Sequence, residues 1–267
     1  MKNNHISRRT MLKSAIAAFI VLGFDPLGRS WITDSSANTG VHIPSLDGIL
    51  LTDSDALDAA SNDFGHIKHR QPFAVLKPGS VDDIIRMVRF ARDHRLSISA
   101  RGQGHTTFGQ SLVEAGVVID MSLLIVPPEI QVDRIKVRAG MLWRDVLSAT
   151  LPHGLTVTVV TGYLGLSVGG TLSVGGIGNL SFRYGAQVDN VIELEVVTGT
   201  GQLEVCSATH KPDLFESALA ELGQCAIIIS VTTRLIPTLT HARVFNLFYA
   251  DIHTMLRDTP TDCGWSV

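Results

Sequence analysis

The chain has 267 residues, 45% of them hydrophobic, which is enough to bury the core of one large domain or two small ones. Its formal net charge is −3 at pH 7, and no basic run occurs beyond the N-terminus. The charge therefore gives no reason to expect nucleic acid as a partner.

The residues that most often bind metals are poorly placed to do so. Cys206, Cys225 and Cys263 match no zinc spacing, and an odd number of cysteines cannot form a complete set of disulfides. Cys206 and Cys225 stand among apolar residues, so we expect both to be small buried side chains. His66 and His69 have no accompanying Cys/His cluster, which favours a solvated pair over a ligand pair. We predict no metal site.

The N-terminus reads as a targeting signal. Paired arginines lie within Ser7–Lys13, and the apolar run Ala15–Phe24 that follows is too short to span a bilayer as a helix. The small residues Ser35–Ala37 offer a cleavage site. We expect residues 1–37 to be a twin-arginine signal peptide and linker, and the mature chain to be periplasmic or extracellular without a stable membrane span. The alternative is a membrane-associated helix that is never removed.

The chain then alternates between strand and helix patterns. Short strands are predicted at 73–76, 96–100, 117–121 and 135–139. A helix starts after Ser80, a favourable N-cap, and carries apolar residues along one face as far as His94. A second, short helix is predicted at 143–150. Together these elements predict a small N-terminal lobe of mixed α and β structure.

The loop Arg101–Ser111 is the most informative stretch. Its glycines let the backbone approach a ligand closely, so that consecutive amides can face a pyrophosphate. His105 lies among them, and an imidazole there can serve as base, metal ligand or nucleophile toward the 8α carbon of a flavin. This indicates a flavin site, although a surface turn with an incidental histidine explains the segment alone equally well. A nicotinamide dinucleotide fingerprint is disfavoured because Thr107 stands where it needs glycine.

Residues 162–185 form a second glycine-rich region, with eight glycines in 24 positions. We expect no compact helix at that density. Apolar residues such as Val168, Leu172 and Ile177 lie between the glycines, which favours ordered backbone around a ligand over a flexible linker. A loop packed against a sheet is the alternative.

The remaining elements predict a second α+β lobe. A strand at 188–198 turns through Gly199–Gly201 into a strand at 202–206, which gives a hairpin. A helix is predicted at 211–222 with Gly223 as its C-cap, followed by a buried strand at 226–236. A further strand-like stretch runs from Val244 to Ala250.

Several motifs occur in collinear order between about residues 60 and 250: Asp63-Phe64-Gly65, Gly104-His105-Thr106, Tyr163–Ser173, Asn190–Gly199, Asp213-Leu214-Phe215 and Leu222-Gly223-Gln224. With them the chain resembles cytokinin dehydrogenases, flavoproteins of the vanillyl-alcohol oxidase and p-cresol methylhydroxylase (PCMH) type. The resemblance implies an α+β fold, with a PCMH-type FAD-binding domain at 60–238. That domain has two α+β subdomains, a small N-terminal lobe and a larger lobe with a mostly antiparallel sheet flanked by helices.

The resemblance also implies a cofactor site. His105 matches the histidine that bonds covalently to FAD, and such a tether makes the flavin a stronger oxidant. The other positions matched to cofactor contacts are Ala100, Arg101, Gly102, Gln103, Gly104, Thr106, Gln110, Gly162, Ser167, Ser173, Ile177 and Ile228. The implied function is an FAD-binding oxidoreductase in which hydride passes from an amine or alcohol C–H bond to the flavin.

The chain departs from the family pattern in three places. The family carries Trp-Thr-Asp, whose aspartate accepts a proton from the amine, where this chain has Val160-Thr161-Gly162; glycine cannot accept a proton. Ala226 adds a Cβ where the family has glycine near the cofactor. The sequence stops at Val267, so we expect residues 239–267 to be only the start of a substrate domain.

Two hypotheses follow from these departures. One is an active oxidoreductase whose pocket is completed by a second polypeptide or a dimer partner covering an exposed apolar face. The other is a catalytically silent FAD-binding fragment, and we assign no catalytic residue. A third possibility, a periplasmic binding protein without flavin, predicts a colourless protein.

Overall fold

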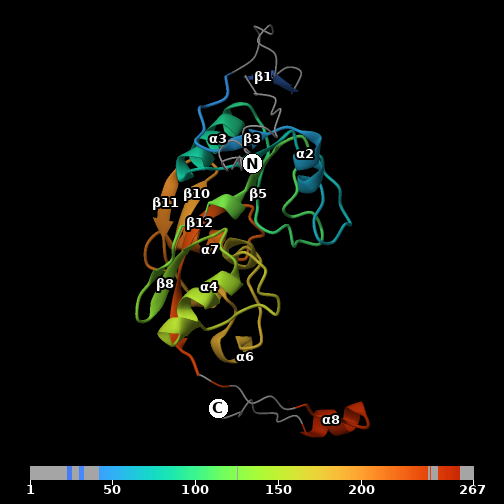
Figure 1. Ribbon diagram of the computed structural model, residues 1–267, viewed down its shortest axis with the longest axis vertical. Helices are drawn as coiled ribbons and strands as arrows, with labels where there is room; N and C mark the ends of the chain where they lie inside the picture. Colours follow the sequence, from blue (N-terminus) through green and yellow to red (C-terminus); the bar gives the residue numbers. More distant parts are fainter. Residues whose placement is uncertain are drawn as a thin grey trace, which may run out of the picture.

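The structure is a computed structural model that describes residues 23–25, 30–32, 42–124, 126–239, 241 and 246–258. The chain forms two lobes that follow one another along the long axis of the molecule (Figure 1). The smaller lobe contains a four-stranded sheet and the larger lobe a six-stranded sheet. This arrangement confirms the predicted α+β fold with two subdomains.

Only part of the predicted signal and linker is described. The pair β1 (Gly23–Asp25) and β2 (Ser30–Ile32) is antiparallel, and the ring of Phe24 is buried in the core of the smaller lobe. The paired arginines and the expected cleavage site lie outside the described residues. Within the described ranges, no helix is long and apolar enough to cross a membrane.

The smaller lobe is a mixed sheet covered on both faces. Its strands are ordered β3-β4-β6-β5, with β4 and β5 parallel to β6 and β3 antiparallel to β4. Val117 and Ile119 lie in the cluster that contains α3, whereas Val118 lies in the cluster that contains Ala60 of α2. Burial on both faces explains the unbroken apolar run of β6. The bounds are β3 (Ile49–Leu51), α2 (Ser54–Ala60), β4 (Ala74–Lys77), α3 (Val81–Asp93), β5 (Ile98–Arg101), β6 (Val117–Asp120) and the 3-10 turn η1 (Met121–Leu123).

The larger lobe is an antiparallel sheet ordered β11-β10-β12-β8-β7, with β9 pairing the far end of β12. Side chains of α4, α5 and α7 share one buried cluster with the strands. The strands are β7 (Glu129–Ile130), β8 (Arg134–Arg138), β9 (Leu155–Val157), β10 (Val191–Thr198), β11 (Leu203–Cys206) and β12 (Ala226–Pro237). The helices and turns are α4 (Trp143–Thr150), η2 (Leu151–His153), α5 (Val168–Leu172), α6 (Ser181–Tyr184), η3 (Val188–Asn190), α7 (Pro212–Ala218) and α8 (Ile252–Asp258).

The boundary between the lobes differs from the prediction. The predicted strand at 135–139 and helix at 143–150 were expected in the smaller lobe, but β8 pairs with β12, with Ile135 opposite Thr233. This long-range pairing has no local signal. The predicted strand at 188–198 begins three residues later, because η3 occupies its start. Of the predicted strand 244–250, the described residues 246–250 form no strand, and α8 follows them.

Helix α7 ends earlier than its apolar pattern predicted. It stops at Ala218 because the following backbone turns to bond with the end of α5. The N–H groups of Ala220 and Leu222 donate to the carbonyls of Leu172 and Ser173 at 2.9 and 2.7 Å. Tertiary hydrogen bonds thus replace the last predicted turn of helix.

The glycine-rich region contains short helices that were not predicted. Gly169 in α5 lies against Ala139, the residue that follows β8, and a Cβ on Gly169 would meet the Cβ of Ala139 at 2.7 Å. Its N–H also donates to the carbonyl of Ala139 at 2.8 Å. The missing side chain therefore permits close packing between helix and sheet, and this outweighs the low helix propensity of glycine.

The two described cysteines differ in environment. Cys206 in β11 is buried, as predicted. Cys225 is exposed, which corrects the prediction that both are buried. It lies in the turn just before β12 begins, so the sheet does not cover it.

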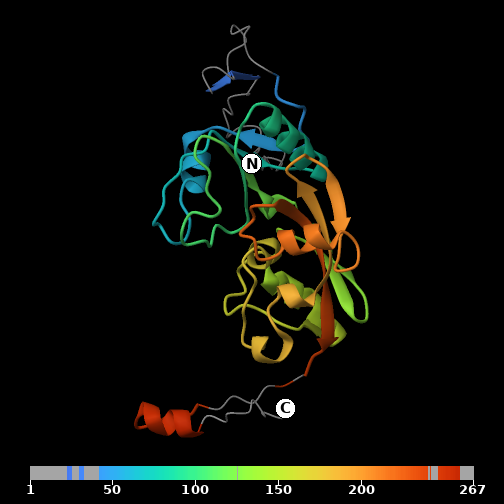
Figure 2. The ribbon, with the colours of Figure 1, turned by 180° about the vertical axis from the view of Figure 1, so that it is seen from behind.

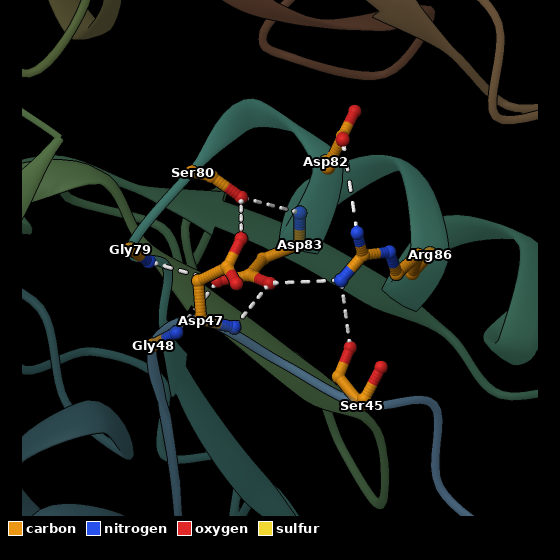
Figure 3. Close-up of polar contacts among 8 residues, drawn as sticks. All are labelled: Ser45, Asp47, Gly48, Gly79, Ser80, Asp82, Asp83 and Arg86. Atoms are coloured by element: carbon orange, nitrogen blue, oxygen red, sulfur yellow. Dashed lines mark hydrogen bonds and ion pairs between the residues drawn. The ribbon is translucent and has the colours of Figure 1, made fainter.

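A buried carboxylate fastens the start of α3 to the segment that leads into β3 and to the turn after β4 (Figure 3). Asp83 is fully buried and accepts hydrogen bonds from the N–H groups of Asp47, Gly48 and Gly79 at 2.8 to 2.9 Å. Burial alone raises the pKa of Asp83, but the backbone donors outweigh it, and the pKa lies below its ordinary value of 3.8.

We predict that Asp83→Asn lowers the free energy of unfolding by roughly 2–4 kcal/mol at neutral pH, because amide nitrogen would replace one acceptor oxygen. The lowered pKa means that the carboxylate stabilises the fold fully above pH 3.8 and loses this effect as pH falls through its folded pKa. Denaturant unfolding should therefore show the two proteins converging in acid.

Asp82→Asn is the matched control. Its side chain is 69% exposed and pairs at 3.7 Å with Arg86, which also lies 3.8 Å from Asp83. We expect a change within about 0.5 kcal/mol for this exposed pair. An equal loss in both variants, or a gap between Asp83→Asn and the unsubstituted chain that persists in acid, would contradict the assignment.

Candidate functional site

A cavity of about 290 Å³ lies between the two lobes. A cavity needs a volume of only roughly 10–15 Å³ to hold one buried water, so this cavity is large enough for a small-molecule ligand. The loops that border it project on the same side of both lobes (Figures 1 and 2). Every predicted cofactor position except Gly162 lines it: Ala100, Arg101, Gly102, Gln103, Gly104, His105, Thr106, Gln110, Ser167, Ser173, Ile177 and Ile228.

The segment Asp63-Phe64-Gly65 holds the histidine loop in place. The N–H of Phe64 donates to the carbonyl of Gly104 at 2.8 Å, and the N–H of Gly65 donates to the carbonyl of Thr106 at 3.0 Å. These two bonds flank His105. The loop is therefore fixed on both sides of its histidine by residues some 40 positions earlier.

Asp63 adds side-chain bonds to the same loop. Its Oδ2 accepts from Thr106 Oγ1 at 2.7 Å and from the N–H of Gly109 at 2.8 Å. Only 3% of Asp63 is exposed. Burial alone raises the pKa of its carboxyl, but the Thr106 hydroxyl and nearby backbone N–H groups outweigh it, so the pKa is lowered. Asp63 is thus an ionised anchor for the loop.

Two glycines of the loop are required by its geometry. Gly104 has φ of +62°, and a Cβ there would lie 2.3 Å from the guanidinium of Arg101. A Cβ on Gly102 would lie 2.1 Å from Ser167 Oγ of the opposite lobe. Larger residues would strain the backbone at 104 and fill the cavity at 102.

Arg101 presents an unpaired donor at the base of this loop. Its Nη2 donates to the carbonyl of Ala59 at 3.3 Å, but its buried Nη1 has no hydrogen-bond partner among the described residues. Burial lowers the pKa of Arg101, and the carboxylates of Asp120 and Asp63 oppose this effect. A guanidinium remains charged at neutral pH, so a buried cationic donor borders the cavity.

The larger lobe supplies a wall of small and aliphatic residues. Ser167 is 3% exposed, and Ser173 Oγ donates to the carbonyl of Gly169 at 2.8 Å. Ile177 is 79% exposed at the rim. Further residues that line the cavity were not predicted: Met121, Thr171, Val174, Leu222, Gly223 and Ile227. Of these, Leu222 and Gly223 belong to the motif Leu222-Gly223-Gln224, which could have indicated them.

His105 lies at the cavity, on its exposed side. Its ring contacts those of Phe64 and Tyr163, with centroid distances of 4.1 and 5.5 Å. Gly162, in contrast, is exposed with no atom within 4 Å of a Cβ built on it, and only its neighbour Thr161 lines the cavity. Ala226, the other departure from the family pattern, does line the cavity.

These features fit FAD. Glycines leave room for the backbone to approach the cofactor, and the positive charge of Arg101, which lines the cavity, suits a pyrophosphate. The aliphatic side chains of Ile177 and Ile228 suit the flavin rings. The wall therefore offers a charged region and an apolar region, as a dinucleotide requires.

Comparisons with known proteins agree with this geometry. Residues 72–207 match the family described as FAD binding domain. The chain is 39% identical to an uncharacterized oxidoreductase in the fasciation locus of Rhodococcoides fascians, over 80% of this chain and 49% of that protein. It is 42% identical to cytokinin dehydrogenase 6 of Oryza sativa subsp. japonica, over 78% of this chain and 42% of that protein. The chain thus spans about half the length of these relatives or less.

A solved structure shows the same fold. The chain superposes on 6-hydroxy-D-nicotine oxidase from Arthrobacter nicotinovorans with a TM-score of 0.65 and 25% identity, over 72% of this chain and 43% of that one. The family match covers half of the chain, and the relatives named above include a cytokinin dehydrogenase. The chain therefore belongs to the FAD binding domain family, as a cytokinin dehydrogenase-like FAD-binding protein.

Proposed function

We propose that the chain is an FAD-dependent oxidoreductase that holds its flavin in the cavity between the lobes and tethers it through His105. The observation that carries this proposal is the fixed histidine loop: Asp63-Phe64-Gly65 bonds to it on both sides of His105, beside a ligand-sized cavity.

The tether is a carbon–nitrogen bond. An imidazole nitrogen of His105 would bond to the 8α carbon of oxidised flavin, with one proton lost from the 8α methyl group and one from the imidazole. The electron pair of the broken C–H bond would pass to dioxygen, which would leave with the two protons as hydrogen peroxide. When bound, FAD would supply the hydride acceptor for a C–H donor. The chain's own residues bind and orient it: loop amides and Arg101 at the pyrophosphate, aliphatic residues at the rings.

We propose an amine as the hydride donor, because the names of two similar proteins, a cytokinin dehydrogenase and a 6-hydroxy-D-nicotine oxidase, refer to amines. Gly162 weighs against efficient turnover, because no carboxylate stands at that position to accept a proton. A catalytically silent FAD-binding protein is therefore the second candidate.

We also propose that the chain binds a protein partner and that it is exported from the cytoplasm. Large apolar side chains are exposed on the segments 64–67, 108 and 163–182, and two of them, Val174 and Ile177, line the cavity: Phe64, Ile67, Phe108, Tyr163, Val174, Ile177, Leu180 and Phe182. A second polypeptide or a second copy of the chain that covers this side would bury them. The paired arginines of the N-terminal signal support export by the twin-arginine route.

Acid precipitation of the purified chain tests the tether. We expect yellow colour to stay in the pellet for the unsubstituted chain and to move to the supernatant for His105→Ala, because the bond to the ring is lost. His153→Ala is the control, since His153 is exposed and does not line the cavity. Colour released from the unsubstituted chain would refute the tether but not FAD binding; a colourless protein would refute both.

Removal of the loop anchor should weaken FAD binding. Asp63→Ala leaves the Gly109 N–H and the Thr106 hydroxyl without their acceptor. Since a lost buried acceptor costs roughly 1–3 kcal/mol, we expect the dissociation constant of noncovalent FAD to rise about tenfold or more in a His105→Ala background. Fluorescence titration measures it. Asp58→Ala, an exposed carboxylate on α2, should bind as before.

The Gly162 position tests turnover. Gly162 has ordinary backbone geometry and open space around it, so Gly162→Asp should fold normally. We expect anaerobic bleaching of the flavin by a secondary amine to be faster in Gly162→Asp than in the unsubstituted chain or in Gly162→Asn, which cannot accept the proton. If amines and alcohols bleach the flavin of neither the unsubstituted chain nor Gly162→Asp, the oxidoreductase hypothesis is refuted. The chain is then a catalytically silent FAD-binding protein.

A further inference from the structure

The imidazole of His105 is bordered by aromatic rings from two parts of the chain. The ring of Phe64 stacks on it, with 4.1 Å between centroids and 27° between planes. Tyr163, from the larger lobe, approaches with its centroid at 5.5 Å and its plane tilted by 32°. A ring from each lobe thus meets the histidine beside the cavity.

Both aromatic residues are fixed by contacts of their own. The N–H of Phe64 donates to the carbonyl of Gly104, the residue just before His105. The carbonyl of Tyr163 accepts from Thr161 Oγ1 at 3.1 Å. The Tyr163 ring also folds back over Gly165, where a Cβ would come within 2.5 Å of it. These contacts hold the backbone of Phe64 and Tyr163 and place the Tyr163 ring over Gly165.

Neither ring contributes much to the core, since Phe64 is 61% and Tyr163 59% exposed. Their contact with His105 has a different consequence. A ring that stacks on the face of an imidazole restrains its rotation and leaves the edge that carries both nitrogens uncovered. The restraint acts on the one side chain of the cavity that the tether requires.

We propose that Phe64 and Tyr163 are positioning residues that hold the imidazole of His105 with a nitrogen directed toward the 8α carbon of the flavin. This inference rests on the proposed function, because it concerns formation of the tether. The two rings touch none of the reacting atoms and act only through His105. Holding a nucleophile near its target geometry speeds bond formation, and one stacking contact of ordinary strength corresponds to about threefold to tenfold in rate.

The test follows tether formation in the full chain, prepared without flavin and then mixed with FAD in air. Flavin that stays with acid-precipitated protein is measured over time, and total bound flavin is measured by gel filtration. We expect Phe64→Leu and Tyr163→Leu to slow attachment about threefold to tenfold, with total bound flavin unchanged. Phe64→Tyr, which keeps a ring, should restore the rate.

Phe108→Leu is the matched control. Phe108 belongs to the same loop and is 63% exposed, and within the described part of the chain its ring does not contact His105. It should attach flavin at the rate of the unsubstituted chain. Thermal unfolding of every variant checks that each one folds.

The outcomes separate this inference from the proposed function. Attachment at an unchanged rate in Phe64→Leu and Tyr163→Leu overturns the positioning role and leaves the tether standing. Equal slowing in Phe108→Leu, or a matching loss of total bound flavin, also overturns it, because the defect is then general. If the unsubstituted chain binds FAD but retains none after acid, the tether and the positioning role both fail; if it binds no FAD, the proposed function fails as well.

Discussion

The cofactor site depends on the contact between Asp63-Phe64-Gly65 and the histidine loop. A loop with three glycines in eleven residues is costly to order, at about 1–2 kcal/mol per residue. Two backbone bonds and the carboxylate of Asp63 supply that order in the folded chain. The loop is therefore held by the chain's own residues, which reduces the entropy that binding a ligand would cost.

The placement of this loop against the larger lobe has a second cause. Val197 of β10 and Ile229 of β12 are buried in the same cluster as α3 of the smaller lobe. Arg89 on α3 donates to the carbonyl of Gly201 in the hairpin at 3.0 Å. Because the lobes share a core and a hydrogen bond, the cavity between them has defined walls, and Gly102 can approach Ser167 closely.

The sequence predicted the fold and much of the site because their signals are local. The apolar alternation of the strands, the Ser80 cap and the glycine loop around His105 are each read from a few adjacent residues. What it could not predict depends on distant partners. The anchoring by Asp63 joins residues 43 to 46 positions apart, and α7 ends early because its last turn bonds to α5. The exposure of Cys225 likewise depends on where β12 begins.

Family membership and catalytic competence rest on different residues. The cavity wall keeps almost every position expected of an FAD site, whereas Gly162 lacks the group that would accept a proton. The residues expected to bind the cofactor thus line the cavity, whereas the proposed hydride transfer would have no carboxylate at position 162.

Mass spectrometry of the proteolysed chain, after incubation with FAD in air, tests the central claim most directly. The claim is that the fixed loop presents His105 to the flavin. It predicts that the peptide containing His105 carries the mass of FAD, and that fragmentation assigns the added mass to this residue. An unmodified His105 peptide, with all of the flavin recovered free or on another residue, would contradict it.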